Sequence, residues 1–353
     1  MIYTSDMKAT LTAQPVRKTN GRVSSGRATI GEIAKICGLS KSTVSRVLNE
    51  QLDVFKISAS TAEQIRKTAA ELGYRQNRLA RAMASGRTHL IGLSLPFVPH
   101  HTDPHDYFVS PIILDQLAGI FSDPRFESYD LVIHKRVAGK PFDAKGDLLD
   151  GMLFVDPEGE CDSRLREWSG QLPIVVLGSA CQGSKMTFVD VDNAGLIAAA
   201  IDAATARGRR IVGYLEPRLL ESFRCMEIRR NAFLKKMPGG RVISLDLDPA
   251  EIRHTLAALP LKPGRDAMVV AEEMTGCLAS QCLRDLGFRV PEDILLVTVG
   301  GEQPAVAANA GLEVIAIPFE RIAKTAIGML LEHLEHGRPL KGELVKVSFS
   351  PEV

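Results

Sequence analysis

Apolar residues recur at helical spacing near the start of the chain, at Ile30, Ile33, Ala34 and Cys37. The spacing i, i+3, i+4, i+7 places these side chains on one face of a helix. Gly38 follows, and glycine readily adopts the left-handed conformation that ends a helix. The pattern therefore predicts a short amphipathic helix followed by a tight turn.

A second short helix is predicted after Ser40, whose hydroxyl suits an N-cap. Its apolar side chains point inward, and its outer face carries Lys41, Ser42, Thr43, Ser45, Arg46 and Asn49. Two helices around a tight turn, with an outer face that forms hydrogen bonds, are typical of proteins that read base edges in the major groove. We expect Lys41, Ser42 and Arg46 to read bases and the other three side chains to position the DNA backbone.

A third helix is predicted from the capping-box pattern of Ser60 and Glu63, and it ends at Gly73. Its buried stripe would consist of Ile65, Ala69 and Leu72. An ordinary helical hairpin is the alternative, but three consistent helices and a basic outer face favour an all-α, helix-turn-helix DNA-binding head over residues 28–74.

A short basic segment follows the three helices. Leu79 and Met83 lie four positions apart, so they share one face if this segment becomes helical. The segment is too short to hold a helix alone in water. We therefore expect residues 75–88 to form a hinge that orders only when paired on DNA, with a plain interdomain linker as the alternative.

Basic residues gather at one end of the chain. Residues 1–89 hold 15 Lys and Arg against 6 Asp and Glu, whereas the remainder holds 28 against 36. A basic head on an acidic body fits a protein that binds a polyanion at one end. Residues 1–27 are polar and basic and predict a disordered arm, which is either an incidental extension or a phosphate-binding one.

The six cysteines lie in apolar or mixed segments without paired metal-ligand spacing, which predicts reduced core cysteines in a cytoplasmic protein. No apolar stretch reaches membrane-spanning length, and no signal peptide opens the chain. The His and Asp residues of 100–106 are metal-ligand types, but Pro99 and Pro104 favour a solvated loop. We therefore expect no metal, no cofactor and no membrane partner.

Apolar runs of strand length alternate with helical stretches from His89 onward. The predicted strands are 90–95, 131–134, 151–155, 174–177, 188–191, 211–214, 242–245, 267–270 and 294–299. The predicted helices are 109–122, 193–206, 221–237, 249–259, 273–286 and 319–335. Such alternation is typical of doubly wound parallel sheets covered on both faces. The pattern restarts near Asp192, so we expect an α/β body of two subdomains with a cleft between them. Their predicted extents are 89–191 with 318–332, and 192–317 with 333–353.

The sequence contains none of the complete enzyme motifs considered below. Gly178 and Gly183 have the spacing of a phosphate loop, but Ser184-Lys185 follows where a lysine and then a serine or threonine are needed. The sequence has no Gly-x-Ser-x-Gly elbow and no His-Glu-x-x-His pattern. A metabolite-handling enzyme with an accessory DNA-binding head remains the alternative function, although it lacks a catalytic constellation. We do not expect an enzyme.

The head resembles the lactose-repressor (LacI/GalR) family of bacterial transcription regulators. The matching segments are Ile33-Ala-Lys35, Gly38-Leu-Ser40, Thr43-Val-Ser-Arg-Val-Leu-Asn49, Leu72-Gly-Tyr74 and Asn77-x-x-Ala-Arg81. Those in the body are Asp150-Gly151, Val191-Asp-Asn-x-Gly195, Arg209-Arg-Ile211, Arg229-x-x-x-Phe233 and Val290-Pro-x-Asp-Ile294. The resemblance implies a body with the fold of type I periplasmic binding proteins.

The resemblance also implies a sequence-specific transcriptional regulator, with a repressor as the expected kind. We expect a homodimer on a near-palindromic DNA operator, since no heptad helix follows the last strand to build a tetramer. Further expected DNA contacts are Thr29, Tyr74, Asn77, Arg81 and Met83. Met83 stands where the family usually has the leucine that wedges a base step open in the minor groove.

Family members commonly bind a small-molecule effector in the cleft. By resemblance, the contacting residues here are Tyr107, Phe108, Arg229, Glu272 and Glu273. Other positions depart from the family's polar pattern, namely Phe223, Cys225, Leu247, Gly300, Gly301 and Ile317. A buried hydroxyl without a partner costs about 1–3 kcal/mol. We therefore expect a less polar effector or an effector-independent regulator, in preference to one that binds an ordinary sugar.

Overall fold

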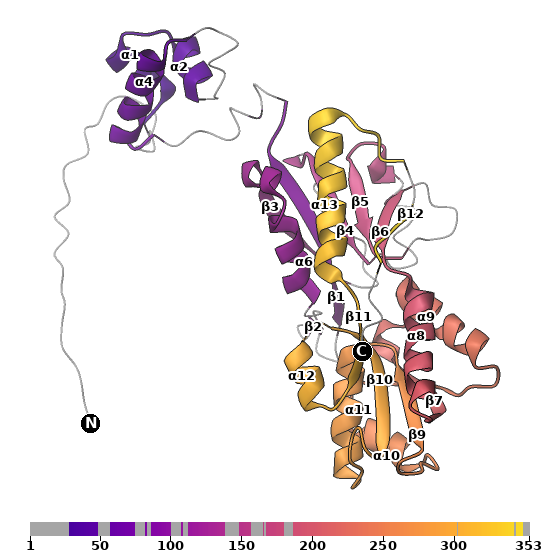
Figure 1. Ribbon diagram of the computed structural model, residues 1–353. Coiled ribbons are helices and arrows are strands. Elements are labelled where there is room, and N and C mark those ends of the chain that lie inside the picture. The colour runs from indigo at the N-terminus through magenta and orange to yellow at the C-terminus, as the bar shows by residue number, and fades with distance from the viewer. Residues whose placement is uncertain are drawn as a thin grey trace, which may run out of the picture. The chain divides into compact units, whose positions relative to one another are not determined.

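The chain divides into two compact units, Met1–Gly86 and Arg87–Val353, which we call the head and the body (Figure 1). The computed structural model describes residues 28–48, 57–74, 82, 86–99, 107–108, 112–137, 148–156, 165, 167–179, 186–301, 303–341 and 344–348. The predictions for the arm at 1–27, for the cluster at 100–106 and for most of the hinge lie outside these residues.

The head consists of three helices around one small core. They are α1 (Ile30–Cys37), α2 (Lys41–Leu48) and α4 (Ala59–Glu71). Ile33, Val44 and Ile65 each have essentially no exposed surface, so every helix contributes a side chain to this core. Gly38 ends α1 with a φ of 67°, as the sequence pattern predicts.

The third helix begins earlier than the sequence predicts. Its N-cap is Ser58, whose hydroxyl accepts a hydrogen bond from the Thr61 backbone N–H at 3.2 Å. The predicted cap, Ser60, lies inside the first turn, so that prediction is wrong. Leu72 is 38% exposed and follows the last helical residue, so it does not belong to the buried stripe that Ile65 and Ala69 form.

Seven strands of the described residues form the first sheet of the body. They are β1 (Leu90–Pro99), β2 (Tyr107–Phe108), β3 (Asp130–Val137), β4 (Gly151–Val155), β5 (Ile174–Leu177), β6 (Thr187–Asp190) and β12 (Leu344–Lys346). The order is β12-β6-β5-β4-β1-β2, with β3 also paired to β1, and only β2 runs antiparallel to its neighbour. β4, β5 and β6 are buried along their whole length because side chains on both faces are covered.

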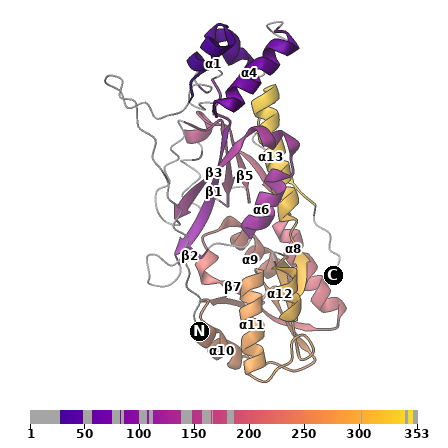
Figure 2. The same cartoon turned by 90° about the vertical axis from the view of Figure 1, so that its left-hand side faces the viewer.

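Two long helices cover one face of the first sheet, α6 (Ile112–Phe121) and α13 (Phe319–His336), and they pack against each other (Figure 2). Leu153 and Val155 of β4 belong to the core on this side, while Met152 and Phe154 belong to a separate apolar cluster. Alternate residues of one strand thus contribute to two cores. A short 3-10 helix, η1 (Pro124–Ser128), connects α6 to β3.

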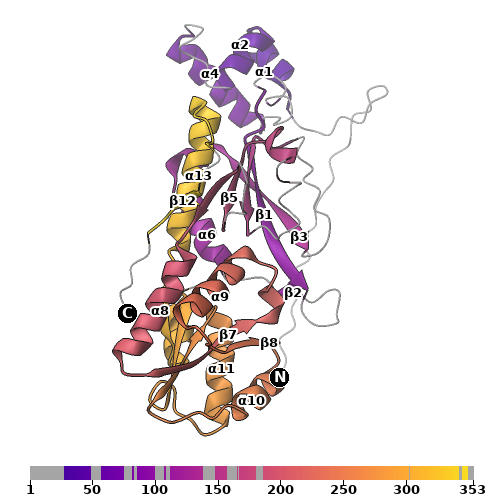
Figure 3. The same cartoon turned by 90° about the vertical axis from the view of Figure 1, so that its right-hand side faces the viewer.

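The second sheet has five parallel strands among the described residues, in the order β11-β10-β9-β7-β8. They are β7 (Arg210–Pro217), β8 (Val242–Leu245), β9 (Asp266–Val270), β10 (Ile294–Gly300) and β11 (Glu313–Ala316). Its helices are α8 (Asn193–Ala206), η3 (Arg218–Leu220), α9 (Arg224–Lys236), α10 (Pro249–Ala257), α11 (Glu273–Asp285) and α12 (Pro304–Asn309). α8 and α9 pack together, as do α10 and α11, and the two pairs join separate apolar clusters (Figure 3). The prediction of two doubly wound parallel sheets is confirmed.

Residues 333–336 and 344–346 lie in the first subdomain, contrary to the predicted assignment of residues 333–353 to the second. β12 pairs with β6 through Val345 and Val189, and α13 continues unbroken to His336 along the first sheet. A three-residue strand has too little periodicity for the sequence to show which sheet it joins. No helix of the described residues is long and apolar enough to cross a membrane.

The contact between α6 and α13 depends on Gly119. A Cβ at this position would overlap the backbone carbonyl oxygen of Glu320, which cannot move without distorting α13. We expect Gly119→Ala to destabilise the body by about 1–3 kcal/mol through overpacking. Thermal unfolding measures this, and Gly328→Ala is the matched control, because its Cβ would meet only side-chain atoms at 3.7 Å. Equal unfolding temperatures for Gly119→Ala and wild type would contradict this account.

Candidate functional site

The outer face of α2 is the candidate surface for DNA. Lys41 and Ser42 are exposed and Arg46 is partly exposed, whereas Val44 and Val47 are buried beneath them. The buried pair fixes the rotation of the helix about its axis. The three predicted base-reading side chains therefore all lie on the part of α2 that the core leaves uncovered.

The start of α2 is organised by Ser40. Its hydroxyl accepts a hydrogen bond from the Thr43 backbone N–H at 3.1 Å. It also lies 2.7 Å from the Ser42 hydroxyl and 2.8 Å from the Thr43 hydroxyl. Capping orients these hydroxyls at the N-terminus of the helix, which favours negatively charged groups such as phosphates.

Other predicted DNA contacts have structural roles in the head. Thr29 forms a capping box with Glu32, in which its backbone N–H donates to the Glu32 carboxylate at 2.7 Å. Tyr74 packs partly buried against the head core. Ser45 is partly exposed on α2. Asn49, Asn77, Arg81 and Met83 lie outside the described residues, so their contacts stay predictions.

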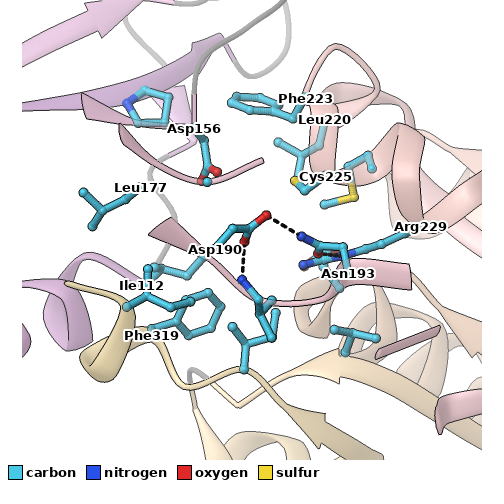
Figure 4. A pocket seen from close by; sticks show the side chains of 18 of the residues that line it. Ile112, Asp156, Leu177, Asp190, Asn193, Leu220, Phe223, Cys225, Arg229 and Phe319 are labelled. Atoms are coloured by element: carbon cyan, nitrogen blue, oxygen red, sulfur yellow. Dashed lines mark hydrogen bonds between the residues drawn. The ribbon is translucent and has the colours of Figure 1, made fainter. Parts of the chain in front are cut away.

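A cavity of about 110 Å³ lies within the body, between its two sheets (Figure 4). The carboxyl ends of strands from both sheets reach it, through Leu177 and Asp190 of the first and Val299 of the second. Helices α6, α9 and α13 complete its wall. Ligands of open parallel sheets bind in the crevice beyond the carboxyl ends of the strands, so this is the expected position for an effector.

A buried row of hydrogen bonds forms one corner of the cavity. Arg229, which is 6% exposed, donates from Nε to Asn193 Oδ1 and from Nη1 to the Ala271 carbonyl oxygen, both at 2.8 Å. Asn193 in turn donates from Nδ2 to Asp190 Oδ2 at 2.8 Å. The Ser179 hydroxyl donates to the same oxygen at 2.7 Å. Arg229, the predicted effector contact, thus lies in the cavity wall with its guanidinium held in place.

The two predicted glutamates have different surroundings. Glu272 lines the cavity and caps α11, since its carboxylate accepts from the backbone N–H groups of Met274 and Thr275, both at 2.7 Å. Burial raises the pKa of Glu272. Glu273 is not among the lining residues, and its carboxylate accepts from the Gly301 N–H at 2.6 Å. Its role is therefore to hold the loop after β10.

Several residues that replace polar residues of the family pattern lie in the cavity wall. Phe223, Cys225 and Ile317 all line it, whereas Leu247 and Gly300 do not. Burial raises the pKa of the Cys225 thiol to about 12, so this cysteine stays protonated. The predicted effector residues Tyr107 and Phe108 form β2, which pairs with the end of β1.

Two acidic residues of the cavity were not identified from the sequence, Asp156 and Asp190. Asp156 directly follows β4, and Asp190 is the last residue of β6, so both lie at the carboxyl edge of the first sheet. An acidic residue at the end of a buried parallel strand is the sequence feature that could have identified them. Burial, reinforced by Asp190, raises the pKa of Asp156 to about 6, although Arg136 and Arg229 oppose the shift. Burial also raises the pKa of Asp190, against its hydrogen bonds from Ser179, Val191 and Asn193.

The raised pKa of Asp156 predicts how the stability of the body depends on pH. A carboxyl with a raised folded-state pKa stabilises the fold fully below its ordinary value of 3.8, and this contribution is lost as the pH rises through about 6. The difference is roughly 2–3 kcal/mol. We expect Asp156→Asn to stabilise the body near neutral pH and to leave its stability near pH 4 almost unchanged. Asparagine tolerates the φ of 39° found here.

Urea unfolding of wild type and Asp156→Asn between about pH 4 and pH 7.5 measures this effect. Asp202→Asn is the control, because the Asp202 carboxylate lies on the surface, with 68% of its side chain exposed. As the pH rises across this range, the free energy of unfolding of wild type should fall relative to that of Asp156→Asn. An unchanged difference between the two proteins would contradict the expected destabilisation by the ionised carboxylate.

Both the head and the body match models of known protein families. Residues 29–77 match the family model of bacterial regulatory proteins of the lacI family, and residues 201–350 match that of the periplasmic binding protein-like domain. The HTH-type transcriptional regulator PtxS of Pseudomonas aeruginosa is 27% identical over 90% of this chain and 93% of its own length. The NTD biosynthesis operon regulator NtdR of Bacillus subtilis is 22% identical over 90% of this chain and 96% of its own.

Solved structures share the fold across both units of the chain. The Lac repressor dimer bound to operator and the anti-inducer ONPF matches with a TM-score of 0.73 and 18% identity, covering 92% of this chain and 97% of that one. The complex of transcriptional regulator CelR with cellobiose matches with a TM-score of 0.56 and 22% identity, over the same shares. The chain therefore combines a helix-turn-helix domain of the lacI family with a periplasmic-binding-protein-like domain, and the relatives that it resembles along most of its length are transcriptional regulators.

Proposed function

We propose that this protein is a repressor that binds a near-palindromic operator as a homodimer, with an affinity set by a small molecule in the body cavity. The observation that carries the proposal is the outer face of α2, where Lys41, Ser42 and Arg46 lie over a buried apolar pair. Because its target is genomic DNA, we place the protein in the cytoplasm. Residues 75–88 act as the hinge between head and body in this proposal.

A single head offers too few contacts for tight binding, and two-fold symmetry doubles them on adjacent half-sites. The body has exposed apolar side chains that suit a self-association surface. Leu114 and Phe121 of α6 are 70% and 57% exposed, and Ile133 of the edge strand β3 is 52% exposed. Leu114 and Phe121 lie seven positions apart, on one face of the helix. A second copy of the chain is the partner that we propose for this face.

The cavity supports an effector-dependent regulator over an effector-independent one, because space remains between the sheets beside a fixed arginine. It contains a thiol, which the alternative enzyme could use as a nucleophile only in its ionised form. Its thiol, Cys225, has a pKa raised to about 12 by burial and is therefore a poor nucleophile. A binding site rather than a reaction centre is the function that these side chains support.

Removal of the Arg46 side chain tests sequence reading by α2. We expect Arg46→Ala to lose about 1–3 kcal/mol of operator affinity and to relax the preference at one base pair of each half-site, if the guanidinium pairs with a guanine. Selection of binding sites from a random DNA pool measures the preference. The control, Arg66→Ala on α4, removes the same charge from the head and should weaken binding to all sequences alike. An unchanged selected sequence for Arg46→Ala would exclude this reading role.

Charged substitutions on the exposed apolar face test the dimer. We expect Leu114→Lys combined with Ile133→Lys to dissociate the dimer, since buried unpaired charges oppose association. Sedimentation equilibrium would then give the mass of one chain. Leu234→Lys on α9, at a position that is 39% exposed, should leave the dimer intact. A wild-type protein that sediments as a monomer would refute the proposed homodimer.

A further inference from the structure

The carboxyl of Asp156 differs from the other acids of the cavity in its hydrogen bonding. Asp190 accepts hydrogen bonds from Ser179, Val191 and Asn193, and Glu272 caps a helix. The Asp156 carboxyl accepts no hydrogen bond from any residue in the described part of the chain, although it lines the cavity. Figure 4 shows it directed toward Asp190. With respect to the described residues, this carboxyl is therefore available to a donor from a ligand.

The arginines nearby are held by neutral oxygens. Arg136, which is 1% exposed, donates to the carbonyl oxygens of Val155 at 2.7 Å and Asp156 at 2.6 Å, and it stacks on the Phe154 ring. Arg229 donates to Asn193 and to the Ala271 carbonyl. Within the described residues, the negative groups at the cavity are thus the carboxylates of Asp156, Asp190 and Glu272. The positive groups are the two guanidiniums of Arg136 and Arg229. With all of them ionised, one negative charge is in excess.

Apart from the amide of the buried Gln116, the remaining wall of the cavity is largely apolar. It includes Ile112, Leu177, Phe223, Ile317, Phe319 and Val299. A cavity of about 110 Å³ holds a compact body on the order of a small ring, since an engineered cavity of about 150 Å³ accepts benzene. A small apolar ring or branched chain fits this wall, whereas a molecule with hydroxyls on every carbon would leave several of them without partners.

We propose that the cavity binds a compact organic ammonium, with the cationic nitrogen between Asp156 and Asp190 and an apolar body against the wall around Phe223 and Phe319. This inference rests on the proposed function of the cavity as an effector site and assigns the chemical class of the effector. The ammonium supplies the missing donor to Asp156 and balances the excess negative charge.

A neutral hydroxyl satisfies only one of these two requirements. It can donate to Asp156, but it leaves the excess negative charge of the site uncompensated. A carboxylate ligand adds a further negative charge beside Asp156 and Asp190, and two of the five N–H groups of Arg229 already donate to Asn193 and Ala271. The expected order of affinity is therefore ammonium, then alcohol, then carboxylate.

Calorimetric titration of the full-length protein with cyclopentylamine, cyclopentanol and cyclobutanecarboxylate near pH 7.5 tests this order. We expect the amine to bind about tenfold or more tightly than the alcohol, because only the amine forms charge-assisted hydrogen bonds. Asp156→Asn should reduce the affinity for the amine to that for the alcohol and leave the affinity for the alcohol nearly unchanged. Asp202→Asn, with its substitution on the surface, should bind the amine as wild type does.

The pH dependence of binding gives a second readout that needs no variant. Lowering the pH to about 5 protonates Asp156, whose pKa is about 6 with Asp190, Arg136 and Arg229 facing it. Amine affinity should then fall about tenfold, in line with the fraction of carboxylate that remains, while cyclopentanol affinity should not. Amine binding that is equal in Asp156→Asn and wild type, or independent of pH, would overturn the proposal.

Operator affinity separates this inference from the proposed function. Each compound is also added to the complex of the protein with the DNA site obtained by selection, and fluorescence anisotropy reports the affinity. If the alcohol or the carboxylate binds best and changes operator affinity, the effector function stands and the ammonium assignment falls. If no compound of the series binds, the ammonium assignment also falls, whereas the role of α2 is decided by the Arg46 selection alone.

Discussion

The buried row from Asp190 through Asn193 to Arg229 links the two subdomains of the body. Asp190 ends β6 of the first sheet, while Arg229 lies on α9 and also holds the Ala271 carbonyl beyond β9 of the second. Each of these groups is buried, so the loss of one partner would leave another unsatisfied at a cost of about 1–3 kcal/mol. The row therefore fixes the strand ends from which the cavity is built.

The cavity combines a largely apolar wall with an acidic side chain that directly follows β4. Asp156 has a pKa raised to about 6 by burial and by Asp190. A neutral side chain at position 156 would therefore increase the free energy of unfolding near neutral pH. A strongly shifted pKa in a cavity is typical of a functional site. Phe223 and Ile317 give the same cavity an apolar surface that suits few polar ligands.

In the head, by contrast, the groups at the helix ends have hydrogen-bond partners within the chain, and these caps and the small core together position the outer face of α2. Thr29 and Ser40 cap the first two helices, and Gly38 makes the turn between them. Val44 and Val47 anchor α2 so that Lys41 and Arg46 remain outside the core. The head thus has a helix with an outer face that the core leaves uncovered, and the body has a cavity whose Asp156 carboxyl accepts no hydrogen bond from the described residues.

The sequence by itself determined the head and the class of the body, since both depend on local periodicity. The spacing of Ile30 to Cys37 and the glycine at 38 suffice for a helix and its end, and alternating apolar runs suffice for parallel sheets. The capping-box pattern of the sequence pointed to Ser60, which is wrong: a serine suits either position, and the helix that buries Ala62 and Ile65 begins after Ser58. Tertiary structure also decided that β12 returns to the first sheet and that Asp156 meets Asp190. Those residues are distant in sequence, and they meet only because parallel strands bring their carboxyl ends to one edge.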